Sequence, residues 1–419
     1  MAQDQLIQQA AWLAQESSGQ PQPDLQHLMR DGALMLTALP PLSLYIHLPW
    51  CLRKCPYCDF NSHAAPEQLD HAIQERYIQA LMADLEAVLP LVWGRPVHTV
   101  FIGGGTPSLF EPQWIDALLA GVRARLDMVP GAEVTLEANP GTFEKDRFRA
   151  FAAAGVTRLS VGVQSFNDEA LHALGRVHTA EQAHAALVEA REAFDTFNLD
   201  LMYALPGQSR EACQADLTEA LRHQPPHLSI YHLTVEPNTY FAKYPPELPD
   251  EDAAFDMMDT IIEGNLSAGL VRYETSAFAK PGHRCQHNLN YWQFGDYIGI
   301  GAGAHSKLSF AHRITRQVKI RDPQRYIQAA LAGRALSSHE ELARRDLAFE
   351  FMLNATRLLD GFKLQDFNDR TGLPVTQIEH ELEIAESKGL IQRDWQRVVP
   401  TALGVNFLSD LQSLFLPKT

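Results

Sequence analysis

The fold of this chain is decided by the stretch YIHLPWCLRKCPYCDF at residues 45–60. Three of the five cysteines, Cys51, Cys55 and Cys58, fall within eight positions there, with the spacing C-x3-C-x2-C. A β-rich run at 43–48 comes directly before them, so we expect a strand that delivers three thiolates to one loop. Cysteine thiolates are the ligands that hold iron–sulfur clusters.

Only three ligands are present on this loop for a cubane that has four irons. The other two cysteines, Cys213 and Cys285, lie far away in the sequence. We therefore expect a 4Fe–4S cluster in which one iron keeps an open coordination position, as catalytic metal sites do. Two alternatives are a structural Cys3His zinc site, with His47 or His63 as the fourth ligand, and a chance grouping of buried thiols.

The cysteine loop resembles that of the radical S-adenosylmethionine (SAM) superfamily, in which the amino and carboxylate groups of SAM bind the fourth iron. Over roughly residues 42–419 the chain also resembles the oxygen-independent coproporphyrinogen III oxidase family and its HemW-type heme chaperone branch. The motifs that carry this resemblance are YIHLPWC at 45–51, GGGTP at 103–107, LEANP at 136–140, SVGVQSF at 160–166 and LDLMYALPGQ at 199–208.

The resemblance implies which residues bind SAM. Glycines in the GGGTP motif let backbone amides approach a ligand closely. Glu137 places a carboxylate among apolar neighbours, where an uncompensated charge is costly; an ion pair at a barrel rim is the alternative. Gln164, Arg176 and Asp200 match family positions around a second SAM molecule. The full set of expected SAM residues is Tyr45, Tyr57, Gly104, Gly105, Thr106, Glu137, Gln164, Arg176 and Asp200.

A second informative stretch is CQHNLNYW at 285–292, in an expected polar loop between 280–282 and an apolar run at 297–303. Imidazole is an axial ligand of heme iron, and flat aromatic rings stack on a porphyrin, although a lone histidine beside aromatic rings is more often packed or hydrogen-bonded. Cys285 is an alternative thiolate ligand that lacks the C-x-x-C-H context of covalent heme. In the HemW branch H-N-x-x-Y-W is associated with heme binding, which implies heme contacts from His287, Asn288, Tyr291 and Trp292.

One departure from the oxidase pattern decides between the branches. The oxidase carries a fourth cysteine two residues after the third, and here that position is Phe60. Phenylalanine can neither ligate a metal nor exchange a proton or hydrogen atom, which puts oxidase activity in doubt. We therefore expect a chaperone that delivers heme to acceptor hemoproteins, membrane respiratory enzymes among them. The alternatives are the oxidative decarboxylation of coproporphyrinogen III and SAM-dependent radical chemistry on an unrelated substrate.

The amino-acid composition limits which binding partners and which cellular compartment we expect for this protein. The chain has 35 basic and 51 acidic residues, a net charge of −16, and so lacks the basic footprint of a nucleic-acid-binding protein. Five cysteines of which three are clustered do not form a disulfide framework, which indicates a reducing cytosol. We find no apolar run near about 18 residues and expect no membrane span. The protein is expected to be cytoplasmic, as a monomer or homodimer.

Short β-type runs alternate with amphipathic segments from residue 43 onward. Six β–α units imply a parallel sheet with right-handed crossovers, and the motifs fall at the carboxyl ends of the strands, where barrel active sites are assembled. We therefore predict a partial (β/α)6 barrel over 41–330. Residues 1–40 are Gln-rich, and we expect them to be a disordered extension or the product of an upstream start codon. Residues 5–15 of this extension fit an amphipathic helix. The expected strands are 43–48, 97–102, 133–138, 157–163, 198–202 and 228–233, and the expected helices are 67–89, 113–125, 144–154, 180–194, 210–223 and 251–268.

The alternation stops after Ile320. Three helices followed by a hairpin are typical of a winged-helix module, which we expect over 331–419 and which the resemblance assigns to the C-terminal domain of the family. Such modules often bind DNA, but 10 basic against 13 acidic residues favour a lid or packing role. The expected helices are 323–333, 339–359, 362–371 and 375–388, and the expected strand pair lies at 391–399.

Overall fold

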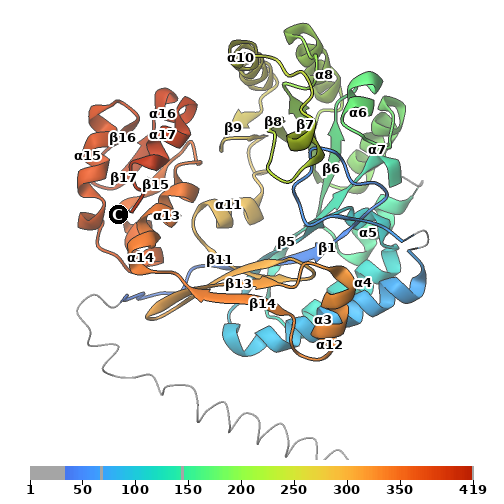
Figure 1. Ribbon diagram of the computed structural model, residues 1–419, viewed down its shortest axis with the longest axis horizontal. Coiled ribbons are helices and arrows are strands. Elements are labelled where there is room, and N and C mark those ends of the chain that lie inside the picture. The colour runs from blue at the N-terminus through green and yellow to red at the C-terminus, as the bar shows by residue number, and fades with distance from the viewer. Residues whose placement is uncertain (1–33, 67–68, 143–145, 418–419) are drawn as a thin grey trace, which may run out of the picture.

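A computed structural model describes residues 34–66, 69–142 and 146–417 (Figure 1). The expected helix at 5–15 and most of the expected extension lie outside these residues. Leu34 and Leu36, at the start of the described part, are buried against the C-terminal core, and the Leu36 amide donates to the Ala311 carbonyl. Among the described residues, no helix combines the length and the apolar character needed to cross a membrane.

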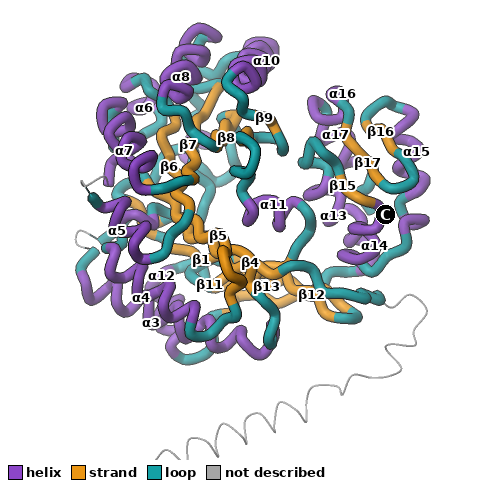
Figure 2. The backbone as a smooth tube through the Cα atoms, turned by 180° about the vertical axis from the view of Figure 1, so that it is seen from behind, coloured by secondary structure: helices purple, strands orange, loops and turns teal. Residues whose placement is uncertain are grey.

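Six parallel strands form the centre of the main sheet, in their order along the chain, and confirm the predicted β–α alternation. Helices cover their outer face, while the carboxyl ends of the strands meet at one edge (Figures 1 and 2). The strands are β1 (Leu42–Leu48), β4 (Val97–Gly104), β5 (Met128–Ala138), β6 (Arg158–Gln164), β7 (Thr196–Tyr203) and β8 (His227–His232). The covering helices are α3 (His71–Val92), α4 (Pro112–Arg123), α5 (Arg147–Ala154), α7 (Ala180–Ala193), α8 (Arg210–Arg222) and α10 (Glu251–Ser267).

Capping side chains fix where several helices begin. The Asp70 carboxylate accepts from the Ile73 amide at 2.9 Å, so α3 begins at His71 rather than at residue 67 as expected. Thr179 and Gln182 form a capping box that starts α7. These are local signals, since each cap and its partner lie within three residues.

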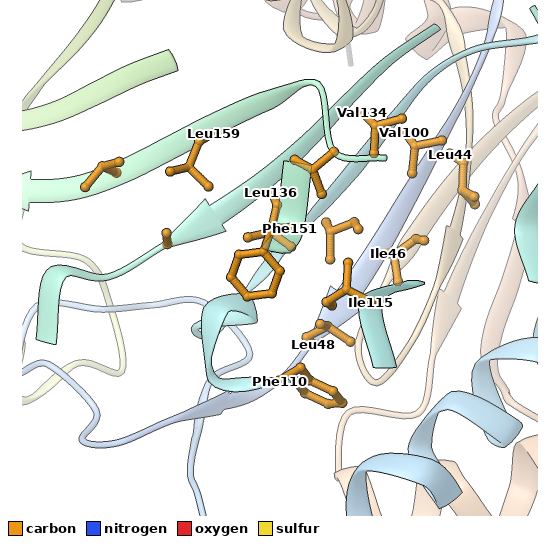
Figure 3. Close-up of a cluster of buried hydrophobic side chains, with 14 of the residues drawn as sticks. Leu44, Ile46, Leu48, Val100, Phe110, Ile115, Val134, Leu136, Phe151 and Leu159 are labelled. Carbon is orange, nitrogen blue, oxygen red and sulfur yellow. The ribbon is translucent and has the colours of Figure 1, made fainter. Parts of the chain in front are cut away.

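The main hydrophobic core lies between the sheet and the helices. Figure 3 shows Leu44 and Ile46 of β1 beside Val100 of β4, with Ile115 of α4 and Phe151 of α5 closing over them. These five side chains have no exposed surface. Complete burial of such a side chain stabilises the fold by about 1.5–3 kcal/mol. The same strands therefore hold their opposite faces, which carry polar residues, in a fixed position.

Within the described residues the sheet has 12 strands, so it is wider than the sequence predicted. At one edge β10 (Ala277–Ala279) and β9 (Val271–Arg272) continue antiparallel from β8. At the other, β11 (Asp296–Ile300) pairs parallel with β1 and is followed by antiparallel β12 (His305–Phe310), β13 (Arg313–Lys319) and β14 (Leu336–Glu341). The two outermost strands of this order, β14 and β9, do not pair with each other among the described residues. The fold is thus mixed α/β with a large, open parallel sheet.

The predicted helix at 339–359 is wrong in its first part. Residues 336–341 are the edge strand β14, and the helix, α13 (Leu347–Ala355), begins later. All six side chains of β14 are exposed, so this strand has no apolar period that could reveal it. Its pairing with β13 decides its conformation, and its charged residues suit a sheet edge.

The C-terminal module has the predicted winged-helix order and its own core. Phe351 of α13 makes edge contacts with Phe362 and Phe367, at centroid distances of 5.1 and 5.2 Å. A three-stranded sheet in the order β15-β17-β16 completes the module. Its remaining elements are β15 (Phe362–Lys363), α14 (Leu364–Thr371), α15 (Glu379–Ser387), β16 (Ile391–Arg393), β17 (Arg397–Pro400), α16 (Ala402–Asn406) and α17 (Leu408–Ser413); α12 (Pro323–Leu331) packs on α3 instead.

A short helix, α11 (Gln286–Trp292), lies between the barrel and the C-terminal module (Figures 1 and 2). The expected polar loop at this position is therefore wrong. Glu133 of β5 accepts from the amides of Gln286 and His287 at 2.9 and 3.1 Å, which satisfies the start of the helix. From the module, Arg357 lies over the Trp292 ring, 4.2 Å from its centroid. The helix is thereby held from both sides.

Candidate functional site

A cavity of about 350 Å³ opens at the carboxyl ends of the parallel strands. This is the position at which barrel folds assemble their active sites. Four predicted residues, Tyr45, His287, Tyr291 and Trp292, do not line it. Twelve of the predicted residues do: Cys51, Cys55, Tyr57, Cys58, Gly104, Gly105, Thr106, Glu137, Gln164, Arg176, Asp200 and Asn288.

The three cysteines of the motif are presented to the cavity by one closed loop. The two-residue strands β2 (Trp50–Cys51) and β3 (His63–Ala64) pair and close its base. Within the loop, the Cys58 amide donates to the Cys55 carbonyl at 3.2 Å. All three thiols therefore lie at the same cavity, and their role as cluster ligands stays a prediction.

Burial raises the pKa of the thiols of Cys51 and Cys58, so without a positive centre both favour the protonated form. A bound metal cluster deprotonates coordinating thiols. Arg176 places a cation beside one of these thiols, since its Nη1 lies 3.7 Å from Cys55 Sγ. The donor set therefore fits an iron–sulfur cluster that supplies the missing positive charge.

The two histidines considered as zinc ligands have other partners. His47 Nδ1 lies 3.0 Å from the Tyr45 hydroxyl and its Nε2 lies 3.0 Å from the Asn61 carbonyl. His63 Nε2 lies 3.3 Å from Asn61 Oδ1. In the part of the chain that the structure describes, no three His, Cys, Asp or Glu side chains, those of the cysteine loop included, are arranged to hold a single metal ion.

The middle of the cysteine loop is held by the segment after β6 and by α9 (Tyr240–Lys243). The Phe241 amide donates to the Pro56 carbonyl at 3.0 Å. Gly175 has a φ of 69°, and a Cβ there would lie 2.6 Å from Pro56 Cδ. Arg176 then donates from Nη2 to the Gly162 carbonyl at 2.8 Å, which ties the loop to β6. These contacts are long-range in sequence, and no local pattern predicts them.

The glycine-rich turn packs on the chain itself as well as lining the cavity. The Gly105 amide donates to the Leu48 carbonyl and the Thr106 amide to the Trp50 carbonyl, both at 2.8 Å. A Cβ on Gly105 would lie 2.6 Å from the Trp50 carbonyl oxygen. On Gly104, whose φ is 116°, a Cβ would lie 2.4 Å from the His47 ring. The glycines therefore let the turn dock against the strand that leads into the cysteine loop.

Two half-buried carboxylates, those of Glu137 and Asp200, face the cavity. Burial and the neighbouring Asp200 raise the pKa of Glu137 to about 7. Burial raises the pKa of Asp200 to about 6, against hydrogen bonds from Asn198 and Ser160 that lower it. The Gly104 amide donates to Glu137 Oε2 at 3.0 Å. A cationic ligand such as SAM would favour the ionised form of both carboxylates.

Tyr45 and Gln164 occupy unusual positions at the cavity. Tyr45 does not line the cavity but lies behind Phe101, which does. The two rings stack at a centroid distance of 6.2 Å. Gln164 lines the cavity with a φ of 72°, next to a register shift between β6 and β7. Strained backbone of this kind in a non-glycine residue is typical of functional sites.

The expected heme residues lie on α11, and only Asn288 lines the cavity. His287 is 9% exposed, and its Nδ1 lies 2.9 Å from Thr99 Oγ1, which leaves Nε2 for another partner. Burial lowers the pKa of His287 to about 3, so the imidazole is neutral. Tyr291 is 37% exposed and stands edge-on to Trp292, 5.1 Å between centroids.

The alternative ligand Cys285 is buried at the start of α11. Its Sγ lies 3.6 Å from Glu133 Oε1. Burial and the Glu133 charge raise the pKa of this thiol to about 12, which disfavours the thiolate. Cys213, on α8, is packed in the main core as expected.

Sequence reasoning missed Phe101, whose ring lies between Tyr45 and His287, 5.0 Å from the latter. Apart from Glu137 and Asp200, it also missed the polar residues that four neighbouring strands present to the cavity in one repeated pattern. In each, a leucine faces the core and the residues before and after it are polar and line the cavity. The triplets are Thr135-Leu136-Glu137, Arg158-Leu159-Ser160, Asn198-Leu199-Asp200 and His227-Leu228-Ser229. Polar residues at alternate positions in otherwise buried strands were the available signal.

Comparisons with known proteins agree with this geometry. The radical SAM superfamily matches residues 45–220, and the HemN C-terminal domain matches residues 342–407. The chain is similar to heme chaperone HemW of Escherichia coli, with 48% identity over 91% of this chain and 100% of that protein. It is also similar to heme chaperone HemW of Haemophilus influenzae, with 45% identity over 91% of this chain and 99% of that protein.

A more distant relative is the mouse protein "Radical S-adenosyl methionine domain-containing protein 1, mitochondrial", with 34% identity over 90% of this chain and 87% of that protein. Among solved structures, coproporphyrinogen III oxidase (HemN) from Escherichia coli has a TM-score of 0.76 over 94% of this chain and 98% of that one. Its sequence identity is 23%, so this likeness concerns the fold.

Proposed function

Because this chain belongs to the HemW family of the radical SAM superfamily, we propose that it is a heme chaperone, which binds heme and transfers it to acceptor hemoproteins. The family implies a 4Fe–4S cluster and SAM. We assign the cluster to Cys51, Cys55 and Cys58, where it would supply an open iron for SAM. Arg176, beside Cys55, offsets negative charge on that loop.

Residues around the cavity would bind and orient SAM. Glu137 and Asp200 offer carboxylates to its cationic groups, and Gly104 keeps the Glu137 carboxylate in place through its amide. The Tyr45 hydroxyl lies 3.0 Å from His47 Nδ1. If Nε2 of that imidazole donates to the Asn61 carbonyl, Nδ1 accepts from the Tyr45 hydroxyl, which holds the Tyr45 ring behind Phe101 of the cavity wall.

The position of Phe60 argues against the oxidase alternative. Its side chain is 63% exposed at the cavity, in the position that the fourth cysteine holds in the oxidase pattern. A side chain without a titratable or redox-active atom gives that position no acid–base or hydrogen-atom chemistry. We therefore assign this chain a binding and delivery role rather than the decarboxylation of propionates.

One observation carries the heme proposal: α11 holds the intact H-N-x-x-Y-W motif at the junction of the cavity and the C-terminal module. Thr99 contacts Nδ1 of His287, which leaves Nε2 as the nitrogen that would ligate iron. Asn288 reaches the cavity, and Tyr291 offers an exposed aromatic ring to the porphyrin. We assign the axial ligand to His287 rather than to the Cys285 thiol. From the same function we also propose that the protein partners are acceptor hemoproteins and that the protein is cytoplasmic.

Hemin titration of the anaerobically reconstituted protein, followed by the Soret band, tests this function. We expect wild type to bind hemin and His287→Ala to bind it about 30- to 1000-fold more weakly, the usual effect of losing a strong buried contact. His339→Ala, which changes an exposed histidine of β14, is the matched control. Normal binding by His287→Ala with loss in Cys285→Ala would move the ligand to the thiol. Failure of wild type to bind hemin, together with anaerobic conversion of coproporphyrinogen III, would favour the oxidase.

A further inference from the structure

The floor of the cavity contains two buried donor groups that have no partner. Thr135 of β5 and Arg158 of β6 are 1% and 2% exposed, and both line the cavity. Thr135 Oγ1 and Arg158 Nη2 are without a hydrogen-bond partner within the described residues. The two residues are paired across the strands, so their side chains are neighbours. Unpaired buried donors, one of them cationic, are costly unless a ligand satisfies them.

The other polar groups of the floor already have partners. His227 lies 2.6 Å from Asn198 Oδ1 through Nδ1 and 2.8 Å from the Tyr273 hydroxyl through Nε2. The Asn198 amide nitrogen donates to Ser160 and to Asp200. These contacts form a closed network on one side of the floor. The unpartnered groups of Thr135 and Arg158 lie outside it.

The charge of Arg158 is only partly compensated within the protein. Its Nη1 donates to the His283 carbonyl at 3.0 Å and lies 3.7 Å from Glu133 Oε2. Glu133 also accepts from the amides of Gln286 and His287, so its charge is shared with the start of α11. Arg158 Nη2 is therefore free to donate to an oxygen in the cavity. The chemistry that matches a guanidinium N–H beside a hydroxyl is a carboxylate.

We propose that Thr135 and Arg158 form a subsite for a carboxylate of the ligand that occupies the cavity. On their strands, Thr135 and Arg158 come two residues before Glu137 and Ser160, a separation of about 7 Å. The proposed subsite therefore lies farther from the cysteine loop than Glu137 and Ser160 do. Cys285, directly before α11, and Asn288 of α11 line the same cavity.

This proximity to α11 favours a heme propionate as the source of the carboxylate, an assignment that rests on the proposed function. The carboxylate of SAM is the other source. The two are distinguished by titrating the same variants with each ligand.

The test uses reconstituted full-length protein titrated with hemin and with iron protoporphyrin dimethyl ester, which lacks free carboxylates. We expect the ester to bind wild type about 10- to 100-fold more weakly than hemin, the scale of a hydrogen-bonded charge. Arg158→Met should weaken hemin binding by a similar factor and leave ester binding unchanged, and Arg158→Lys should restore part of it. Thr135→Val, which removes only the hydroxyl, should have a smaller effect in the same direction. Arg222→Met, an exposed arginine of α8, is the control.

Equal binding of hemin and ester by wild type and by both floor variants would overturn the subsite and leave the chaperone function standing. A loss of SAM affinity in Arg158→Met and Thr135→Val, with hemin binding unchanged, would keep the carboxylate subsite and assign it to SAM. If wild type binds no hemin and the variants bind SAM normally, the subsite and the proposed function both fail. Iron and sulfide content, measured in every variant, separates these outcomes from misfolding.

Discussion

His47 Nε2 lies 3.0 Å from the carbonyl oxygen of Asn61, which joins the first strand of the barrel to the end of the cysteine loop. The amide group of Asn61 continues the connection, because its nitrogen donates to the carbonyls of Ala302 and Arg321 at 2.9 and 2.8 Å. Burial lowers the pKa of His47 to about 4, so the imidazole that makes this contact is neutral. The loop that carries the thiols is thus fixed from behind by a side chain that does not itself line the cavity.

Replacing His47 by alanine should therefore loosen the cysteine loop. We expect the free energy of unfolding to fall by about 1–3 kcal/mol, because a buried carbonyl and the Tyr45 hydroxyl lose their partner. The loop should also retain less iron during anaerobic gel filtration. Urea unfolding and iron analysis measure both effects, with His98→Ala, an exposed histidine of β4, as the control. An unchanged urea midpoint together with full iron retention would contradict this role.

Gly104→Ala should disturb the site beyond its effect on backbone strain. A Cβ at Gly104 would lie 2.4 Å from the His47 ring, whereas at Gly207, which also has a positive φ, it would meet nothing within 4 Å. Both substitutions should cost about 1–2 kcal/mol in backbone strain, but only Gly104→Ala should weaken the change that SAM causes in the EPR spectrum of the cluster. Equal SAM responses in the two variants would show that the His47 contact is not required.

Each of Cys51→Ala, Cys55→Ala and Cys58→Ala should abolish binding of the oxygen-sensitive cluster, since a cluster held by three thiolates cannot lose one and persist. Cys213→Ala should retain it, because Cys213 is buried in the main core. Iron and sulfide analysis after anaerobic reconstitution gives the answer. One zinc per chain without iron would contradict the cluster assignment.

Glu137 should make the cluster-free protein less stable as the pH rises. Its pKa is raised to about 7 in the folded state, so the folded protein holds a proton that the unfolded chain has already released. The protonated Glu137 carboxyl makes its full contribution to the free energy of unfolding below about pH 4.5. This contribution, roughly 3 kcal/mol, is lost as the pH rises through about 7. Over the same range SAM affinity should increase, because the ionised carboxylate attracts the cationic ligand.

Glu137→Gln should flatten both pH profiles. Denaturant unfolding between pH 5 and 8 measures the first and SAM titration the second, with Glu263→Gln, an exposed residue of α10, as the control. Asp200 contributes a residual slope near pH 6, because its pKa is raised to about 6. Profiles for Glu137→Gln that overlay those of wild type would refute the assignment.

The sequence by itself determined the features that depend on neighbouring residues. The C-x3-C-x2-C spacing places Cys51, Cys55 and Cys58 on one loop whatever surrounds it, and the alternation of β-type and amphipathic runs predicted the six central strands and the helices between them. Thr179 and Asp70 start their helices through contacts within three residues. Such signals are visible in a sequence because both partners lie in the same short window.

Tertiary structure decided the contacts between residues that are distant in the chain. Strand β14 has no apolar pattern and exists because β13 offers it hydrogen bonds. Thr135 and Arg158 meet because β5 and β6 pair in one particular register, and a shift of one residue would turn each of these side chains to the opposite face of the sheet. The bond from His47 to Asn61 likewise forms only once the cysteine loop folds back on β1.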